Sequence, residues 1–169
     1  GDVEFGAGYA AAEDRLFLMD VLRHTAESTL SSFLGGGAGN LASDEAQWTV
    51  APYTQADLQK QINDLPVLYG KAGSQLVSDM GNYVDGVNAY IATIRQNPSQ
   101  APFEYTAIEK TPQPWQATDL VAEASLIGAI FGKGGGNELP SALTEEAFLK
   151  RFGHTAGRTA LENFREAND

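Results

Sequence analysis

Two long segments in which apolar residues recur every three or four positions constrain the fold of this chain more than any other feature. In residues 9–34 the recurring side chains are Ala12, Leu16, Met19, Leu22, Ala26, Leu30 and Phe33. In residues 73–95 they are Leu76, Met80, Tyr83, Val84, Val87, Ile91 and Ile94. This spacing places the apolar side chains on one face of an α-helix. We therefore predict two long amphipathic helices and a mainly α fold with at most a few short strands.

Shorter helices are predicted between and after these two segments. Thr54 and Asp57 have the spacing of a capping box, so a helix is expected to begin there, and Pro66 is expected to interrupt it or to begin the next one. Thr118 is expected to cap a helix that runs to about Phe131. This helix is apolar almost all round, which predicts a central, buried position. Two closing helices are expected near residues 141–152, with Gly153 as the C-cap, and near 155–167.

The segment that follows the first long helix carries weaker signals. Residues 35–40 are rich in glycine and predict a flexible break. Residues 41–53 are expected to be irregular, with Trp48 and Tyr53 as anchors. Weak strand patterns occur in residues 48–50 and 103–105.

Composition excludes several classes of protein. The 169 residues include no cysteine, which rules out zinc–thiolate sites, iron–sulfur clusters and thiol nucleophiles within this chain. The 22 acidic residues outnumber the 11 Lys and Arg residues and give a net charge of -11, which disfavours nucleic-acid binding. No apolar run approaches the roughly 20 residues that span a bilayer, so we expect no membrane span. The length suggests a single helical domain over residues 1–169.

Isolated residues that could carry chemistry each have a structural explanation. His24 and His154 are the only histidines and lie far apart in the sequence, so structural or surface roles are expected. The polar side chains within residues 79–88 fall at helical spacing and predict a solvated helix face rather than a calcium loop. Arg15 follows two acidic residues and predicts a local ion pair, the alternative being a buried Arg15 that ties the helix to another segment. These residues form no complete catalytic constellation.

Four segments, taken in order over about residues 5–153, resemble a known family. They are residues 8–20 (GYAAAEDRLFLMD), 83–91 (YVDGVNAYI), 112–119 (PQPWQATD) and Phe131 with 134–139 (GGGNEL). Together they are similar to segments of the penicillin amidase (penicillin acylase) family of N-terminal nucleophile hydrolases. The resemblance is confined to the α-chain region of that family.

The resemblance implies a fold, an activity and a location. Family members are secreted precursors that cleave themselves into a small α chain and a large β chain, and their αββα core is flanked by helices from the α chain. The N-terminal Ser of the β chain attacks the amide carbonyl, with its own α-amino group as the base. This chain is then expected to be a fragment of the α chain of a periplasmic or secreted acylase. Its partners would be the β chain and a small acylated amide, such as a β-lactam, an acyl-homoserine lactone or a lipopeptide.

The resemblance also implies roles for three residues, and none of them is catalytic. Ile127 and Phe131 match positions that contribute apolar side chains to the acyl pocket, although both are equally compatible with a core role in a buried helix. Glu138 matches, within a one-residue insertion, a ligand of a structural calcium ion that the β chain completes. Its alternative role is that of an acidic residue at a helix N-terminus. No other cofactor is required, and the chain alone is expected to be inactive and to self-associate through exposed apolar surface.

A different class of function remains open from the sequence. The apolar helix near residues 118–131 would also serve as the docking surface of a non-enzymatic helical binding or scaffold domain.

Overall fold

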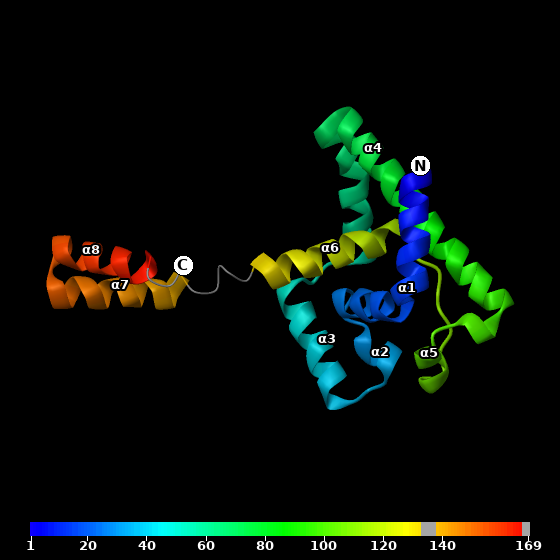
Figure 1. Cartoon of the computed structure of the whole chain (residues 1–169), viewed down its shortest axis with the longest axis horizontal. Coiled ribbons are helices and arrows are strands. Elements are labelled where there is room, and N and C mark those ends of the chain that lie inside the picture. The colour runs from blue at the N-terminus through cyan, green and yellow to red at the C-terminus, as the bar shows by residue number, and fades with distance from the viewer. Residues whose placement is uncertain (133–137, 167–169) are drawn as a thin grey trace. The chain divides into compact units, whose positions relative to one another are not determined.

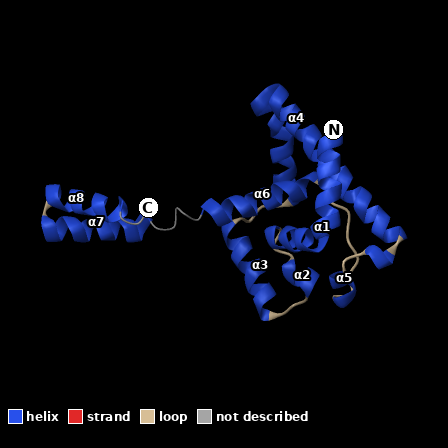
Figure 2. Ribbon diagram, viewed as in Figure 1, coloured by secondary structure: helices blue, strands red, loops and turns tan. Residues whose placement is uncertain are grey.

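The structure is a computed structural model that describes residues 1–132 and 138–166. Every regular element in this part of the chain is a helix, which confirms the mainly α fold (Figure 2). The elements are α1 (Asp2–Ala26), α2 (Leu30–Leu34), α3 (Ala38–Val50), α4 (Gln55–Gln96), the 3-10 helix η1 (Pro98–Gln100), α5 (Phe103–Ala107), α6 (Ala117–Gly132), α7 (Glu138–Phe152) and α8 (His154–Glu166). The strand patterns at residues 48–50 and 103–105 were wrong, because both lie in helices.

The first predicted helix is divided in two. α1 ends at Ala26, the chain turns through Ser28 at φ 57°, and α2 follows as a separate short helix. Within α1 the backbone of Arg15 is not helical (φ -153°, ψ 30°), so the helix is kinked there. The apolar stripe continues across the turn because Leu30 and Phe33 are buried like the stripe residues of α1.

Most of the segment expected to be irregular is helical, and only residues 51–53 of it are not. α3 begins at Ala38, inside the break predicted over residues 35–40, so only residues 35–37, with Gly35 at φ 99°, separate it from α2. The Asp44 carboxylate of α3 accepts hydrogen bonds from the backbone N–H groups of Leu30 and Ser31 at 2.7 and 3.0 Å. The fold therefore uses α3 to satisfy the free N-terminal donors of α2. Tyr53 is an anchor as predicted, since its hydroxyl donates to the carbonyl of Ala26 at 2.6 Å. Trp48 is 53% exposed and is not an anchor.

α4 is a helical hairpin rather than one straight helix (Figure 1). It begins with the predicted capping box of Thr54 and Asp57. The interruption predicted at Pro66 falls four residues later, at Gly70, whose backbone (φ 56°, ψ -127°) separates the two arms. The arms approach so closely that a Cβ on Gly73 would lie 1.9 Å from the carbonyl oxygen of Leu65. Only glycine permits that approach.

The main core lies where α1 crosses the second arm of α4 (Figure 1). Two glycines allow the crossing: a Cβ on Gly8 would lie 2.0 Å from the carbonyl oxygen of Tyr83, and one on Gly86 would lie 2.0 Å from that of Phe5. The buried members of this core come from the two predicted stripes, from Tyr90 beside the second stripe, and from two aromatic residues that follow α4. They are Ala12, Leu16, Met19, Phe33, Val84, Val87, Tyr90, Ile91, Ile94, Tyr105 and Trp115.

α6 is buried along one face only, so the prediction of burial all round was wrong. Ala122 and Leu126 join a second core cluster with Ala26 and Leu58, whereas Ile130, on the same helix, is 53% exposed.

The predicted N-cap of α6 was also wrong. Thr118 lies inside the first turn, and the carboxylate of Asp119 accepts the hydrogen bond from the backbone N–H of Gln116 at 2.8 Å. An acidic side chain near the helix N-terminus also suits the helix dipole.

Contacts divide the chain into two compact units, Gly1–Ile127 and Gly128–Asp169. In the second unit α7 and α8 form a hairpin whose turn is Gly153 at φ 77°, which confirms the two predicted closing helices and their C-cap. That residues 1–169 form a single domain within a longer protein stays a prediction. Among the helices of the described part, none is long and apolar enough to cross a membrane.

Candidate functional site

A buried charge network forms the polar centre of the first unit. Asp20 and Arg23 lie one turn apart on α1 and are almost completely buried. The Arg23 Nη2 contacts Asp20 Oδ1 at 2.8 Å, and Arg23 Nη1 contacts Asp119 Oδ2 at 3.3 Å. The Nη1 also donates to the carbonyl of Pro114 at 3.2 Å. One guanidinium therefore joins α1 to the segment that leads into α6.

Two aromatic side chains complete the coordination of Asp20. The Tyr105 hydroxyl donates to Asp20 Oδ2 at 2.7 Å, and the Trp115 indole N–H donates to Oδ1 at 2.9 Å. The Arg23 guanidinium carbon also lies 5.0 Å from the centre of the Trp115 ring, a cation–π contact. Burial raises the pKa of the Asp20 carboxyl, while Arg23 and the two aromatic donors favour its charged form. Burial and the Asp20 charge raise the pKa of Tyr105, so its hydroxyl stays a donor.

Asn88 of α4 holds the same segment from the other side. Its side-chain amide donates to the carbonyl of Trp115 at 2.9 Å and accepts from the Trp115 backbone N–H at 2.8 Å. Asp20, Asn88 and Trp115 belong to three of the four family-like segments. The network is thus the place where these three segments meet. Each of its contacts joins one part of this chain to another.

Two further carboxyl groups lie close to Asp119. Burial first, and then the charge of Asp119, raise the pKa of Glu123 to about 7. Its Oε1 is buried and has no hydrogen-bond partner. Burial and Asp119 also raise the pKa of Glu27, which accepts a hydrogen bond from Gln55. The surroundings of Arg23 therefore hold more acidic than basic groups.

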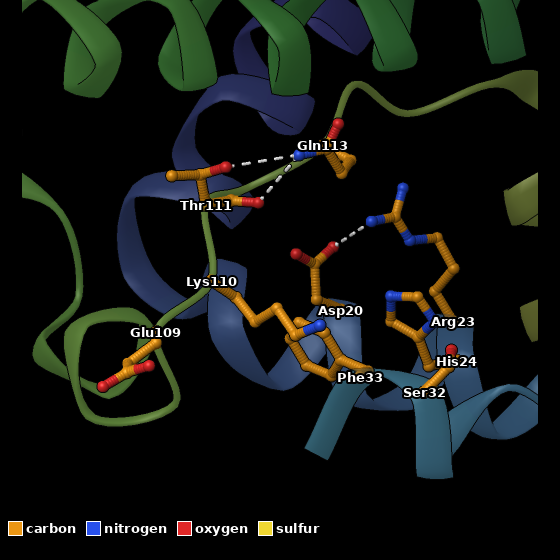
Figure 3. A pocket seen from close by; sticks show the side chains of 9 residues that line it. All are labelled: Asp20, Arg23, His24, Ser32, Phe33, Glu109, Lys110, Thr111 and Gln113. Carbon is orange, nitrogen blue, oxygen red and sulfur yellow. Dashed lines mark hydrogen bonds and ion pairs between the residues drawn. The ribbon is translucent and has the colours of Figure 1, made fainter. Parts of the chain in front are cut away.

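A polar cavity of about 380 Å³ lies beside the network (Figure 3). Figure 3 shows the Asp20–Arg23 ion pair at its edge and Gln113 hydrogen-bonded to Thr111 on its rim. His24 also lines it, stacked on the ring of Phe33 with centroids 4.4 Å apart.

His24 is held in a structural role in this cavity. Its Nδ1 shares a hydrogen bond with the Thr29 hydroxyl at 2.8 Å. Burial first, and then the nearby charge of Arg23, lower the pKa of His24 to about 4, so the ring is neutral at pH 7.

A second hollow, of about 330 Å³, is lined almost entirely by aliphatic side chains. It lies between both arms of α4 and the start of α6. Its lining residues are Gln61, Ile62, Leu65, Leu76, Met80, Leu120, Val121 and Ala124. We call this hollow the apolar groove.

The residues implied by the family resemblance lie on or after α6. Ile127 and Phe131 are 44% and 81% exposed, so neither is a core residue of this chain. Glu138 begins α7, and its side chain lies outside the described part of the structure. Within the described residues no group of three or more His, Cys, Asp or Glu side chains is placed to hold a metal ion. A calcium ion needs six to eight oxygens, so Glu138 would need ligands from elsewhere.

Sequence reasoning missed the residues of the network. The Arg15 side chain is 62% exposed and only 3.9 Å from Asp14, so the local ion pair is what forms there. The buried arginine that ties α1 to another segment is instead Arg23. A weak signal existed, because Asp20 and Arg23 each follow directly after a residue of the apolar stripe.

In the described residues, the fold and the network define a helical protein in which side chains of three family-like segments hold helices together. The family model described as penicillin amidase matches residues 1–165, and the chain belongs to that family. Penicillin G acylase of Escherichia coli is 29% identical over 120 residues, which are 69% of this chain and 12% of that protein.

Two further comparisons agree with this assignment. Penicillin acylase 2 proenzyme of Pseudomonas sp. (strain SE83) is 28% identical over 125 residues, 74% of this chain and 14% of that protein. The solved structure of a thermostable penicillin G acylase from Alcaligenes faecalis, in a tetragonal form, matches with a TM-score of 0.67 and 27% identity over 95% of this chain and 79% of that chain. The chain spans only a small part of the curated relatives that it matches.

Proposed function

We propose that this chain is the α-chain part of a penicillin-amidase-type hydrolase, and that the catalytic serine lies on a separate β chain. The family match over residues 1–165 carries the proposal. The chain covers 79% of a solved acylase chain but only 12% and 14% of the two curated relatives. The solved acylase chain is therefore much shorter than the two curated relatives. This difference in length supports the proposal that a small helical chain is accompanied by further polypeptide.

The catalytic chemistry in this proposal belongs to the β chain. Its N-terminal Ser attacks the carbonyl of a linear amide, and the free α-amino group accepts the hydroxyl proton. The substrate is a small acylated amide: a β-lactam side chain, an acyl-homoserine lactone or a lipopeptide. The precursor is exported to the periplasm or secreted. The present chain contributes no catalytic residue and is inactive alone.

The part played by this chain is to present α6 to the acyl group. Asp119, in the first turn of α6, is tied to Arg23 of α1, and Ala122 and Leu126 pack in the second core cluster. This leaves Ile127 and Phe131 exposed, one turn apart on the same helix. In the assembled enzyme they line the acyl pocket. Glu138 supplies one ligand of a structural calcium ion, and the β chain supplies the others.

The test compares alanine variants in the enzyme assembled with its β chain. Ile127→Ala and Phe131→Ala each remove an apolar side chain from the proposed pocket, so kcat/KM for a long-acyl or phenylacetyl chromogenic amide should fall about tenfold or more. Leu41→Ala is the matched control, because Leu41 is 47% exposed, close to the 44% of Ile127, but lies on α3, which carries neither pocket residue. Equal effects of all three variants would contradict the pocket role.

The alternative function, a non-enzymatic binding domain, gives a different result. In that case the assembled protein hydrolyses no amide, and the chain binds a partner through α6. The observation that favours it is the apolar groove, which α6 helps to line.

A further inference from the structure

The polar cavity beside the network contains a buried donor that none of the described residues satisfies. Arg23 is only 5% exposed, and its two terminal nitrogens contact Asp20 and Asp119. Its Nε is buried as well but has no hydrogen-bond partner. Figure 3 shows the Nε on the edge of the guanidinium that is turned toward His24, which also lines the cavity. A buried donor of a charged group is costly when it is left unpaired, so an acceptor is expected at this edge.

A second cation of the cavity also lacks an acceptor. Lys110 forms no ion pair and no side-chain hydrogen bond within the part of the chain that the structure describes. Figure 3 shows its side chain reaching across the cavity toward Phe33. Burial first, then the charge of Arg23 and more weakly that of Lys110, lower the pKa of His24, so both cations lie near that ring. Two cationic donors thus face one cavity without an acceptor.

The acidic groups of the lining do not neutralise these donors. The Asp20 carboxylate is already held by Arg23 and by two aromatic donors, and it is the one acidic side chain that the cavity buries. Glu109 is exposed, and Figure 3 shows its side chain directed away from Arg23. Without Glu109, two cations stand against one carboxylate. The interior of the cavity is therefore positive in a chain whose net charge is -11.

The size and the donor set of the cavity favour a carboxylate over a phosphate. A volume of about 380 Å³ suits a small ligand. Two separate cationic donors match the two oxygens of a carboxylate. A phosphate dianion would bring more oxygens and a second negative charge beside Asp20, and the described lining has no third cation to meet them. The stacked rings of His24 and Phe33 offer an apolar surface for the rest of the ligand.

We propose that the polar cavity binds a small organic carboxylate, whose oxygens accept hydrogen bonds from the Nε of Arg23 and the Nζ of Lys110. The apolar part of the ligand lies against the rings of Phe33 and His24. None of these residues belongs to the proposed acyl pocket, and the inference does not depend on amide hydrolysis. It gives the Arg23 network a second role, because the contacts that join the helices also hold the guanidinium in place for the ligand.

The test follows the Nε–H resonances of the arginines in the ¹⁵N-labelled chain by NMR, during titration with acetate, benzoate and inorganic phosphate. The Arg23 resonance should move downfield and saturate with both carboxylates, because its Nε–H gains a charged acceptor. Benzoate should bind more tightly than acetate, because its ring adds apolar contact. The resonance of Arg158, which is exposed on α8 outside the cavity, should not move.

A pair of lysine variants tests the second donor. Lys110→Gln should weaken benzoate binding about fivefold or more, because it removes one charged partner of the carboxylate. Lys71→Gln is the matched control, since Lys71 is also exposed but lies on α4 outside the cavity, and it should change the dissociation constant by no more than about twofold. Circular dichroism first shows that both variants are folded.

Three results would overturn the inference. The first is the absence of a saturable shift of the Arg23 resonance with either carboxylate, which would mean that water satisfies the buried Nε. The second is tighter binding of phosphate than of benzoate. The third is an equal loss of benzoate affinity in Lys110→Gln and Lys71→Gln, which would place the ligand elsewhere on the chain.

Discussion

Replacing Gly86 by alanine tests whether α1 and α4 cross as closely as the structure shows. A Cβ at this position would lie 2.0 Å from the carbonyl oxygen of Phe5 and 2.8 Å from the backbone nitrogen of Tyr9. Both neighbours are backbone atoms of a packed helix, so no side-chain rotation can relieve the clash. The two helices must move apart, and the contacts of the main core are loosened with them.

Two opposing contributions decide the size of the effect. Alanine is favoured over glycine within a helix by about 1 kcal/mol. Overpacking of a well-packed contact costs about 1–3 kcal/mol, and a backbone clash belongs at the upper end of that range. The expected net effect of Gly86→Ala is a loss of about 2 kcal/mol in the free energy of unfolding.

Gly81→Ala is the matched control for this prediction. Gly81 lies in the same helix, and a Cβ there would meet nothing within 4 Å. This variant should gain roughly 0.5–1 kcal/mol from helix propensity alone. Urea denaturation followed by circular dichroism at 222 nm measures both values. If Gly86→Ala were stabilised to the same extent as Gly81→Ala, the close crossing of α1 and α4 would be refuted.

Three further predictions concern the network and the exposed apolar surface. Asp20→Asn removes one charged, buried partner of Arg23 and should lower the free energy of unfolding, measured by urea denaturation, by about 3 kcal/mol. Asp14→Asn is the control at an exposed ion pair and should lower it by less than about 1 kcal/mol. Equal losses in the two variants would contradict the network. The pKa of Glu123 is raised to about 7, so its contribution to stability is present at acid pH and is lost as the pH rises to 7. Glu123→Gln should therefore be more stable than the wild type at pH 8 and lose this advantage near pH 4.5. Glu45→Gln is the control at an exposed glutamate. A difference in stability between Glu123→Gln and the wild type that does not change with pH would contradict the raised pKa of Glu123. The chain alone should form dimers or larger species by light scattering, and Leu76→Glu should reduce them more than Leu41→Glu; a monomer at high concentration would contradict the exposed apolar face.

Local patterns predicted the helices whose partners lie within this chain. The stripe residues Leu16, Val87 and Ile91 are buried as their spacing indicated, and the capping box at Thr54 forms. These features depend on neighbours three or four residues away, which a single sequence displays.

Features that depend on distant partners were not predictable in the same way. Asp20 is buried because Tyr105 and Trp115, 85 and 95 positions away, donate to it, and no local pattern shows that they meet. The apolar character of α6 predicted burial, but hydrophobicity does not say whether the covering molecule is this chain or another. The exposed Ile127 shows the limit of that signal.

Three of the four family-like segments, residues 8–20, 83–91 and 112–119, therefore have a clear physical role in this chain: they pack helices and join them through the Arg23 network. The central claim is that such a scaffold becomes an amide hydrolase only with its β chain. The direct measurement is hydrolysis of a phenylacetyl or long-acyl chromogenic amide by this chain alone, by the β chain alone, and by the two refolded together. The proposal predicts turnover in the mixture and none with this chain alone. Turnover by this chain alone, or a stable mixed complex without turnover, would contradict it.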